Sequence, residues 1–330
     1  MAEQAGQTCQ ELHLGFIGAG DWVEKYHIPV IRRLSRRQRL SVSGIWNRTR
    51  SKAENLVARF DLPKVYRDLQ EIIDDPDVDR FAVAVNSRGV RDILRRLAVR
   101  NLPVLCEKPP GRNGEEAREL AEVITATNVV AFNRRYMPLN QQFKSLLEEW
   151  PGIDYVECSF YRRDRDVASF VTETGIHGIN LLEYLIGDIA GLGCERWAVA
   201  NTSTCNWLAN LRFSNGVRGL IKFFPFAGIN LEMVAVSGRG LTASIQTAHP
   251  FTDARAGFIK IDRNDSKGEI ATLIIEQQEL DPLTAGGFEG EYLDFFGAIR
   301  ENRTTVSNFQ NAWRSMVIAE AIERGNSIEL

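Results

Sequence analysis

The sequence predicts an α/β protein of two domains, a doubly wound parallel sheet followed by an α+β domain with an open, mainly antiparallel sheet. The chain has 330 residues, of which 44% are hydrophobic, enough for two cores. Up to residue 131, short apolar runs alternate with amphipathic stretches, a pattern typical of parallel strands joined by crossover helices. From about residue 154, strand-like runs follow one another with only turns between them. We therefore expect domains at 1–131 and 132–330.

The first domain is expected to contain five strands connected by helices. The predicted strands are Leu12–Ile17, Leu40–Trp46, Arg80–Val85, Val104–Cys106 and Val129–Phe132. The predicted helices are Ser51–Phe60, Asp68–Ile73, Val90–Val99 and Asn113–Ile124. Two of these helices begin with a polar residue that is followed three positions later by glutamate, Ser51 with Glu54 and Asn113 with Glu116. This spacing is typical of a capping box, so both starts are well marked.

The second domain is expected to place its strands between one early helix and two late ones. The helices are Leu139–Glu149, Glu289–Arg300 and Asn308–Arg324. The strands are Tyr155–Phe160, Glu195–Ala200, Thr204–Phe213, Val217–Phe224, Leu231–Ser237, Gly257–Ile261 and Ile270–Glu276. Phe223, Phe224 and Phe226 suggest an uncovered apolar face, which predicts a homodimer or homotetramer formed through this sheet.

Composition narrows the classes of function. The 40 Lys and Arg residues nearly balance the 43 Asp and Glu residues, and a net charge of -3 disfavours obligate nucleic-acid binding. No run approaches the roughly 18 apolar residues of a spanning helix, and Met1–Gln10 has no apolar signal core. We therefore expect a cytoplasmic protein without a membrane partner. Five scattered cysteines, with no Cys-x-x-Cys pair, predict neither disulfides nor a metal site.

A glycine-rich turn follows the first strand directly and reads Gly18, Ala19, Gly20, Asp21, Trp22, Val23. In a dinucleotide-binding turn, the first glycine permits the sharp bend and the second lets backbone amides approach a pyrophosphate at a helix N-terminus. Val23 stands where the third glycine of G-x-G-x-x-G would be, so the motif alone is partial. Its place after the first strand of a βαβ pattern favours a nucleotide site that includes Gly18, Gly20, Asp21 and Trp22. The alternative is a turn that serves helix packing alone.

The end of the second strand predicts which nicotinamide cofactor binds. An acidic residue at this place would bond the ribose 2′-hydroxyl and repel a 2′-phosphate, but the chain has Asn47, Arg48 and Thr49. A guanidinium offers a planar fork to a phosphate, and Thr49 adds a hydroxyl. These residues favour NADP(H) over NAD(H). The competing interpretation makes Arg48 a solvated surface residue.

A lysine stands at the carboxyl end of the fourth predicted strand, in the run Cys106, Glu107, Lys108, Pro109, Pro110, Gly111. Ligands of open parallel sheets bind at this edge, so Glu107 and Lys108 could reach the nicotinamide end of the cofactor. Without other evidence, a stiff proline-rich loop would explain the run equally well. The preceding glycine turn and the motifs that follow favour a functional lysine.

At this point the sequence resembles the glucose-fructose oxidoreductase, inositol dehydrogenase and MocA family of dehydrogenases. The motifs that carry the resemblance span most of the chain: His27-Ile28-Pro29, Glu107-Lys108-Pro109, Phe132-Asn133-Arg134-Arg135-Tyr136 and Glu173-x-x-x-His177-x-x-Asn180. The resemblance implies an N-terminal Rossmann domain, a second domain with an open sheet, a nicotinamide cofactor, and hydride exchange on a sugar or cyclic polyol. It also implies that Lys108 lies beside substrate and nicotinamide, and it allows a cis peptide before Pro109.

Three polar residues near the start of an apolar helix are candidates for proton transfer. Glu173 and His177 are four residues apart, so on a helix they would share a face and could hydrogen-bond. An imidazole oriented by a carboxylate suits proton transfer near neutral pH. The family commonly has aspartate at the positions of Glu173 and Asn180, so this chain departs twice. We expect Asn180 to bind a substrate hydroxyl, without the charge that an orienting aspartate would bring.

The sequence thus predicts an NADP(H)-dependent dehydrogenase or reductase acting on a sugar, ketosugar or cyclic polyol. His177, oriented by Glu173, exchanges the proton on the reacting oxygen or shares that task with Lys108, which otherwise polarises the carbonyl oxygen. The sequence does not decide which of the two is the acid. Tyr161 and Arg162 are candidate substrate contacts, whereas Arg163 and Arg165 are expected in a solvated loop. Two alternatives remain: an imine or other non-sugar carbonyl reductase, and a cofactor-binding sensor or scaffold without turnover.

Overall fold

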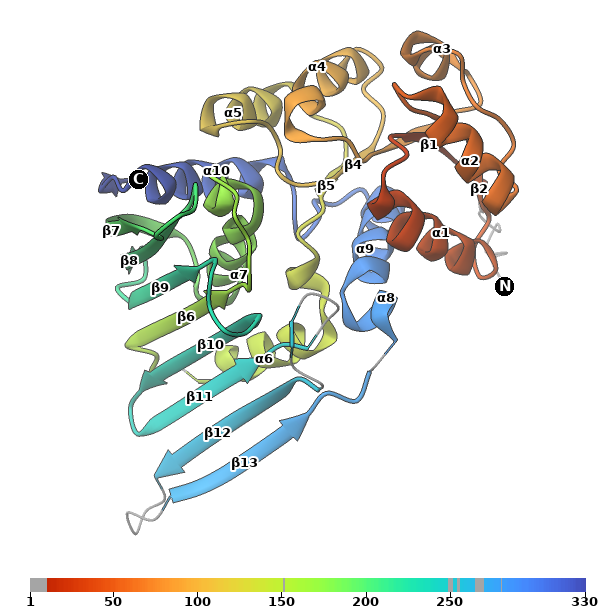
Figure 1. The fold of residues 1–330 in the computed structure, drawn as a ribbon. Coiled ribbons are helices and arrows are strands. Elements are labelled where there is room, and N and C mark those ends of the chain that lie inside the picture. The colour runs from red at the N-terminus through yellow and green to blue at the C-terminus, as the bar shows by residue number, and fades with distance from the viewer. Residues whose placement is uncertain (1–10, 151, 249–251, 254–255, 265–269, 280) are drawn as a thin grey trace, which may run out of the picture.

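The computed structural model describes residues 11–150, 152–248, 252–253, 256–264, 270–279 and 281–330 (Figure 1). The segment Met1–Gln10, which bears on the expected location, lies outside the described residues. Two sheets organise the chain, one of five strands and one of nine. No helix of the described residues is long and apolar enough to cross a membrane.

The first sheet is parallel throughout, with the strand order β2-β1-β3-β4-β5. Its strands are β1 (Leu12–Ile17), β2 (Leu40–Trp46), β3 (Arg80–Val83), β4 (Val104–Cys106) and β5 (Asn128–Val130). The helices that connect them are α1 (Ile28–Ser35), α2 (Arg50–Phe60), α3 (Leu69–Asp74), α4 (Ser87–Ala98) and α5 (Gly114–Val123). Because the order reverses direction at β1, a crevice opens between β1 and β3 at their carboxyl ends, where such folds bind ligands. The predicted doubly wound sheet is confirmed.

Alternating side chains of these strands supply two separate cores. On one face, Phe16 of β1 is buried with Ile31 of α1 and Leu56 of α2. On the other face, Phe81 of β3 is buried with Leu94 of α4. Both faces are thus covered by helices, as a parallel sheet requires.

The second sheet has the order β13-β12-β11-β10-β6-β9-β8-β7-β14 and is antiparallel except for the β6–β9 pair. Its strands are β6 (Tyr155–Tyr161), β7 (Ile189–Ala198), β8 (Cys205–Phe213), β9 (Arg218–Phe224), β10 (Leu231–Gly238), β11 (Leu241–Gln246), β12 (Phe258–Asn264), β13 (Ile270–Glu276) and β14 (Ile328–Glu329). The helices α6 (Pro138–Glu148), α7 (Ile176–Ile186) and α10 (Phe309–Arg324) lie along one face of the sheet (Figure 1). The predicted α+β class is confirmed.

The uncovered face of this sheet differs from the prediction at one phenylalanine. Burial alternates along β9, and Phe223 is fully buried on the face toward α7, where it packs edge-on against Phe160. Phe224 is half-buried on the opposite face, and Phe226 is 36% exposed just after the strand. Phe223 therefore belongs to the core and is not part of the open surface.

A segment late in the chain packs against the first domain, although it follows residue 132. Helix α9 (Phe288–Glu301) returns to the first domain and buries Phe288, Tyr292 and Phe295 in the same core as Phe16 and Ile28. The short helix α8 (Pro282–Ala285) precedes it. Arg33 of α1 donates to the Asp281 carboxylate at 2.6 Å and 3.1 Å, which fastens this return. The predicted range 132–330 thus includes a segment that packs with the first domain.

Candidate active site

The turn after β1 has the geometry that a pyrophosphate site needs. Gly18 has a φ of +115°, and a Cβ there would lie 2.1 Å from the carbonyl oxygen of Ala84, so only glycine fits. A Cβ on Gly20 would instead meet nothing within 4 Å. Protein packing therefore does not require glycine at position 20, whereas a ligand lying close to the backbone would. This observation fits a bound dinucleotide.

Asn47 braces the turn. Its Oδ1 accepts a hydrogen bond from the backbone N–H of Ala19 at 3.1 Å, and its Nδ2 donates to the carbonyl oxygen of Thr49 at 2.8 Å. Both ends of the amide are engaged by the protein. Asn47 therefore shapes the turn and the β2–α2 loop, a role the sequence did not predict.

Two cavities meet at the carboxyl ends of β1 and β3, and both are lined by Gly20, Ala84 and Val85. The larger has a volume of about 590 Å³ and the smaller about 250 Å³. They lie on either side of the glycine turn and together form a trough that suits the two halves of a dinucleotide.

The smaller cavity carries the residues predicted to choose the cofactor. Asn47, Arg48 and Thr49 line it, joined by Lys52. The Arg48 side chain is exposed, and the described residues offer it no hydrogen bond or ion pair. Sequence reasoning missed Lys52, although it stands four residues after Arg48 in the first turn of α2. The smaller cavity therefore holds two cations and, among its described lining residues, no carboxylate.

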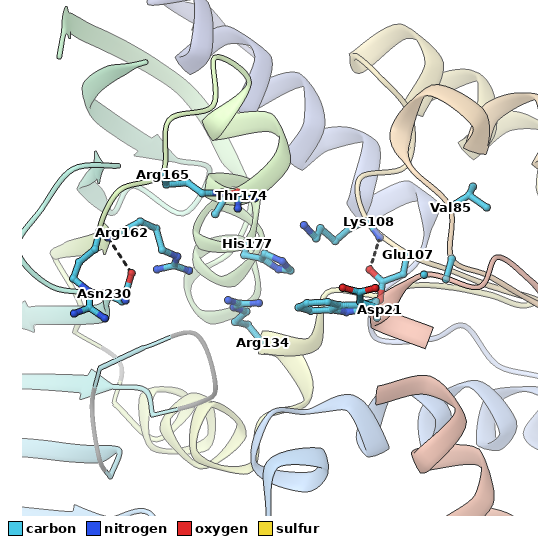
Figure 2. A pocket seen from close by; sticks show the side chains of 14 residues that line it. Asp21, Val85, Glu107, Lys108, Arg134, Arg162, Arg165, Thr174, His177 and Asn230 are labelled. Carbon is cyan, nitrogen blue, oxygen red and sulfur yellow. Dashed lines mark hydrogen bonds between the residues drawn. The ribbon is translucent and has the colours of Figure 1, made fainter. Parts of the chain in front are cut away.

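Lys108 lies at the other end of the trough, in the larger cavity (Figure 2). Its Nζ donates to the carbonyl oxygen of Glu173 at 2.7 Å, and the Lys108–Pro109 peptide is cis. Burial lowers the pKa of Lys108 to about 8, with Arg134 adding to the effect and Glu107 opposing it. An ammonium with this pKa can give up its proton near physiological pH.

Glu107 is held in place by a histidine that the sequence linked only loosely to the site. His27 is 2% exposed, with Nε2 2.9 Å from Oε1 of Glu107 and Nδ1 2.8 Å from the Tyr292 hydroxyl. The backbone N–H of Lys108 donates to the other Glu107 oxygen at 3.2 Å. Tyr292 belongs to α9, so helix α9 stabilises the loop that carries Lys108 through the contacts Tyr292–His27 and His27–Glu107.

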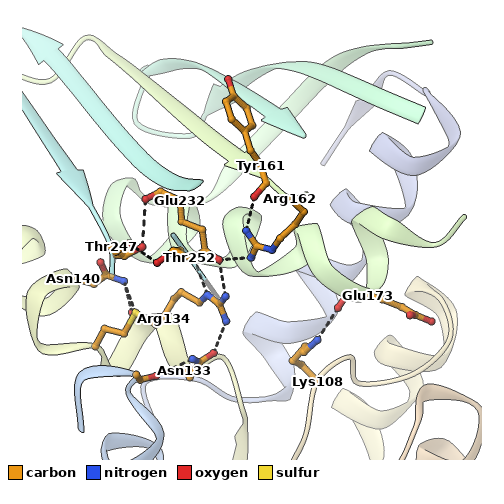
Figure 3. Close-up of polar contacts among 12 residues, drawn as sticks. Lys108, Asn133, Arg134, Asn140, Tyr161, Arg162, Glu173, Glu232, Thr247 and Thr252 are labelled. Atoms are coloured by element: carbon orange, nitrogen blue, oxygen red, sulfur yellow. Dashed lines mark hydrogen bonds and ion pairs between the residues drawn. The ribbon is translucent and has the colours of Figure 1, made fainter. Parts of the chain in front are cut away.

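His177 faces the cavity but is not oriented by Glu173. No hydrogen bond joins the two side chains, and Nδ1 of His177 is buried without a partner among the described residues. Glu173 instead contributes its backbone carbonyl to Lys108, while its carboxylate points away from Lys108 (Figure 3). The expected Glu173–His177 pair is wrong because residues 171–175 form a wide π-helical turn, which shifts the side chains from their α-helical spacing. Burial, then the charges of Arg134 and Lys108, lowers the pKa of His177 well below its usual value.

Two predicted substrate contacts lie outside the cavity. Asn180 is 1% exposed, its Oδ1 accepts from Nε of Arg135 at 2.6 Å, and its Nδ2 donates to the Ser315 hydroxyl at 2.9 Å. It tethers α7 to α10 and is buried away from the cavity lining, so the expected contact with a substrate hydroxyl is not formed there. The ring of Tyr161 stacks on Phe224 on the open face of the sheet, with centroids 5.0 Å apart.

Arginines from the second domain form the wall opposite Lys108. Arg162 lines the cavity as expected. Arg163 and Arg165 are exposed, as expected of a solvated loop, and they line the cavity as well. Arg134 and Asn230 complete this wall. Neither was predicted as a site residue, although Arg134 lies in the motif Phe132–Tyr136, whereas nothing in its local sequence distinguishes Asn230. Asp21, Trp22 and Glu107 line the cavity from the first domain.

Fold and site together define a two-domain protein with a candidate dinucleotide trough and a lysine at its inner end. Residues 12–134 match the sequence model described as "Oxidoreductase family, NAD-binding Rossmann fold". This first-domain segment is therefore similar to the glucose-fructose oxidoreductase, inositol dehydrogenase and MocA family that the motifs indicated.

Curated relatives match parts of the chain. Trans-1,2-dihydrobenzene-1,2-diol dehydrogenase of Xenopus laevis is 31% identical over 33% of this chain and 34% of its own length. Levoglucosan dehydrogenase of Pseudarthrobacter phenanthrenivorans is 31% identical over 29% of this chain and 26% of its own length. An uncharacterised protein of Saccharomyces cerevisiae is 24% identical over 55% of this chain and 57% of its own length.

Solved structures resemble the whole chain. A levoglucosan dehydrogenase in complex with NADH and L-sorbose superposes with a TM-score of 0.85 at 18% identity, covering 97% of this chain and 99% of that one. An NAD-binding oxidoreductase of Klebsiella pneumoniae gives a TM-score of 0.83 at 17% identity, covering 97% and 98%. At these identities the likeness establishes the two-domain fold.

Proposed function

We propose that the chain is an NADP(H)-dependent dehydrogenase or reductase that transfers a hydride to or from a carbonyl or alcohol carbon of a sugar, ketosugar or cyclic polyol. The observation that carries the proposal is the trough shared by the two cavities, with Gly20 at its middle and Lys108 at its inner end. The partial similarity to two proteins that are named as dehydrogenases also supports the proposal. When bound, the nicotinamide supplies or accepts the hydride.

Lys108 moves the proton in this mechanism. With a pKa of about 8, its ammonium is protonated at neutral pH and can donate to the oxygen of a carbonyl as that carbon is reduced. In the oxidative direction the neutral amine takes the proton from the hydroxyl. The Lys108 charge also stabilises a developing alkoxide.

His177 orients the substrate oxygen. Because its pKa is lowered well below the usual value, the imidazole is neutral at pH 7 and is a poor proton donor to a carbonyl. A neutral ring still offers a hydrogen bond to the same oxygen. This difference favours Lys108 as the acid, a choice that the sequence left open.

NADP(H) is the cofactor that the smaller cavity favours. Arg48 and Lys52 place two cations beside the end of β2, and no acidic side chain lines the cavity among its described residues. A 2′-phosphate would pair with both groups, whereas the ribose 2′-hydroxyl of NAD(H) would leave their charges uncompensated.

The test is a turnover assay on the purified full chain. Sugars, ketosugars and cyclic polyols are supplied with NADP⁺ or NADPH, and the change in reduced nicotinamide is followed by absorbance. Turnover with at least one compound, faster with NADP(H) than with NAD(H), supports the proposal. Turnover only with imines would favour the alternative reductase, and NADPH binding without turnover on either panel would favour a sensor.

We further propose that two copies associate through the open face of the second sheet. On this face Tyr155 and Trp197 are 40% and 44% exposed, and the Trp197 ring lies against the half-buried Phe224. Exposed apolar patches of this kind mark interaction sites. Light scattering should give the mass of a dimer or tetramer, and Trp197→Glu should lower that mass. A monomer at micromolar concentration would contradict this proposal. The cytoplasmic location remains a prediction.

A further inference from the structure

The wall that the second domain contributes to the larger cavity is rich in cations. Its lining residues are Arg134, Arg162, Arg163, Arg165, Thr174, His177 and Asn230. Four of these seven are arginines, and no carboxylate appears among the described residues of this wall. The two acidic lining residues, Asp21 and Glu107, come from the first domain.

Only part of this positive charge is balanced within the protein. Arg134 donates from Nε and Nη2 to the Glu232 carboxylate at 3.1 Å and 2.7 Å, and Arg162 pairs with the same carboxylate (Figure 3). One carboxylate thus faces two guanidinium groups. The Arg163 side chain reaches Asp253 at 3.2 Å, toward the surface. For the Arg165 guanidinium, the described part of the chain provides neither an ion pair nor a hydrogen bond.

Backbone contacts fix the loop that presents these arginines. The N–H of Arg162 donates to the carbonyl of Phe224 at 2.8 Å, and the N–H of Ala227 donates to the carbonyl of Arg162 at 2.8 Å. The N–H of Arg165 donates to the carbonyl of Pro225 at 3.0 Å. The backbone of Arg165 is therefore fixed at the rim of the cavity, so the loop itself needs little ordering when a ligand binds.

The arginines lie across the cavity from the proposed reaction centre. In Figure 2, His177 lies between Lys108 and Glu107 on one side and Arg162 and Arg165 on the other. A substrate whose reacting carbon sits at Lys108 would extend its far end toward Arg162 and Arg165.

We propose that the substrate is a polyhydroxy compound with an acidic group, a carboxylate or a phosphate, at the end remote from the reacting carbon. Arg165 and Arg162 bind this group, because a guanidinium fork matches two oxygens of either anion. A neutral sugar would offer the Arg165 guanidinium no charged partner. This inference rests on the proposed function, whose substrate class it narrows.

Titration calorimetry on the full chain saturated with NADP⁺ tests the inference. The ligands are D-glucuronate, glucose 6-phosphate, neutral D-glucose and, as an anion control, sodium sulfate at matched ionic strength. We expect at least one acidic sugar to bind about 10- to 100-fold more tightly than D-glucose, the range for a hydrogen bond to a charged group. D-glucuronate and glucose 6-phosphate separate a carboxylate site from a phosphate site. Equal binding of acidic and neutral sugars, no binding of either acid, or sulfate binding as tight as theirs overturns the inference.

A pair of matched variants locates the site. Arg165→Gln removes the charge of a side chain that the described structure does not use for packing, and Arg36→Gln removes one from the exposed end of α1. Arg165→Gln should weaken the acidic ligand about tenfold or more and leave D-glucose unchanged, whereas Arg36→Gln should change neither. An Arg165→Gln protein with unchanged affinity for the acid overturns the inference. Failure of the dehydrogenase proposal would appear separately, as absent NADP⁺ binding, and the same ligand comparison is then made on the cofactor-free protein.

Discussion

The two walls of the larger cavity are built in different ways. The first-domain wall comes from three short segments, residues 20–22, 84–85 and 107–108, that each follow a strand of one sheet. The opposite wall collects Arg134, Arg162, Thr174 and Asn230 from four separate places in the chain. The first wall is fixed by local motifs at a sheet edge, whereas the second depends on how distant segments pack. We therefore expect the proposed proton transfer to depend on the first wall and selectivity for substrate to depend on the second.

Removing the amine of the first wall should have the largest effect. Lys108→Met keeps the length of the side chain but removes the proton donor, so kcat should fall roughly 100- to 10,000-fold. The Kd of NADPH should change little, because the proposed phosphate contacts lie elsewhere. Lys144→Met, on the remote helix α6, is the matched control. Full turnover of Lys108→Met would refute the assignment of this lysine.

The pH profile provides a second test of the same wall. Since reduction needs protonated Lys108, kcat/KM for reduction should be level below pH 8 and fall about tenfold per unit above it. For oxidation, which needs the neutral amine, kcat/KM should rise with pH and level off above pH 8. Both pH profiles should be measured under conditions where the chemical step limits the rate. The account requires kcat/KM to fall with pH for reduction and to rise with pH for oxidation. Profiles that change in the same sense would contradict Lys108 as the acid.

The smaller cavity predicts a change in cofactor preference. Arg48→Ala should lower the affinity for NADPH about 10- to 100-fold and leave that for NADH almost unchanged, since only NADPH carries the 2′-phosphate. Fluorescence titration of both cofactors gives the ratio. Arg67→Ala, an exposed residue before α3, should leave it as it is. An unchanged ratio in Arg48→Ala would show that the 2′-phosphate is not bound here.

The smallest effect is expected at Glu173. Its carboxylate is not bonded to His177, and its contact with Lys108 comes from the backbone carbonyl, which a substitution keeps. Glu173→Gln should therefore change kcat/KM by less than about threefold, whereas an orienting carboxylate would cost far more. Steady-state kinetics on the best substrate decide between the two. A 100-fold loss of kcat/KM would contradict this result and support the Glu173–His177 pair that the sequence suggested.

The sequence contained enough information for most of the first domain. The bounds of β1, β2 and β4 are those predicted, and Asn113 caps α5 by accepting from the N–H of Glu116 at 2.9 Å. The reciprocal half of this box does not form, because Glu116 accepts from the N–H of Arg112. The other predicted box is absent: α2 begins at Arg50, whose guanidinium bonds Glu54 at 2.7 Å. The spacing of Ser51 and Glu54 correctly predicts that a helix lies here. It does not predict the first residue of that helix, because Arg50 bonds the Glu54 carboxylate that the box would have used.

The second domain shows what local patterns leave undetermined. The strand β11, with the sequence LTASIQ, was missed because small polar residues weaken its apolar alternation. Tyr161 and Arg162 are adjacent, yet the alternation of a strand and its end sends the first to the open face and the second to the cavity. The Arg134 guanidinium at the site is paired with Glu232, which lies 98 residues further along the chain. Such a wall cannot be read from spacing alone.

The most direct test of the central claim is a crystal structure of the full chain with NADP⁺. If the two cavities form one dinucleotide site, the pyrophosphate will lie against Gly20, the 2′-phosphate between Arg48 and Lys52, and the nicotinamide beside Lys108. NADP⁺ bound with its nicotinamide away from Lys108, or outside the trough between β1 and β3, would contradict the account.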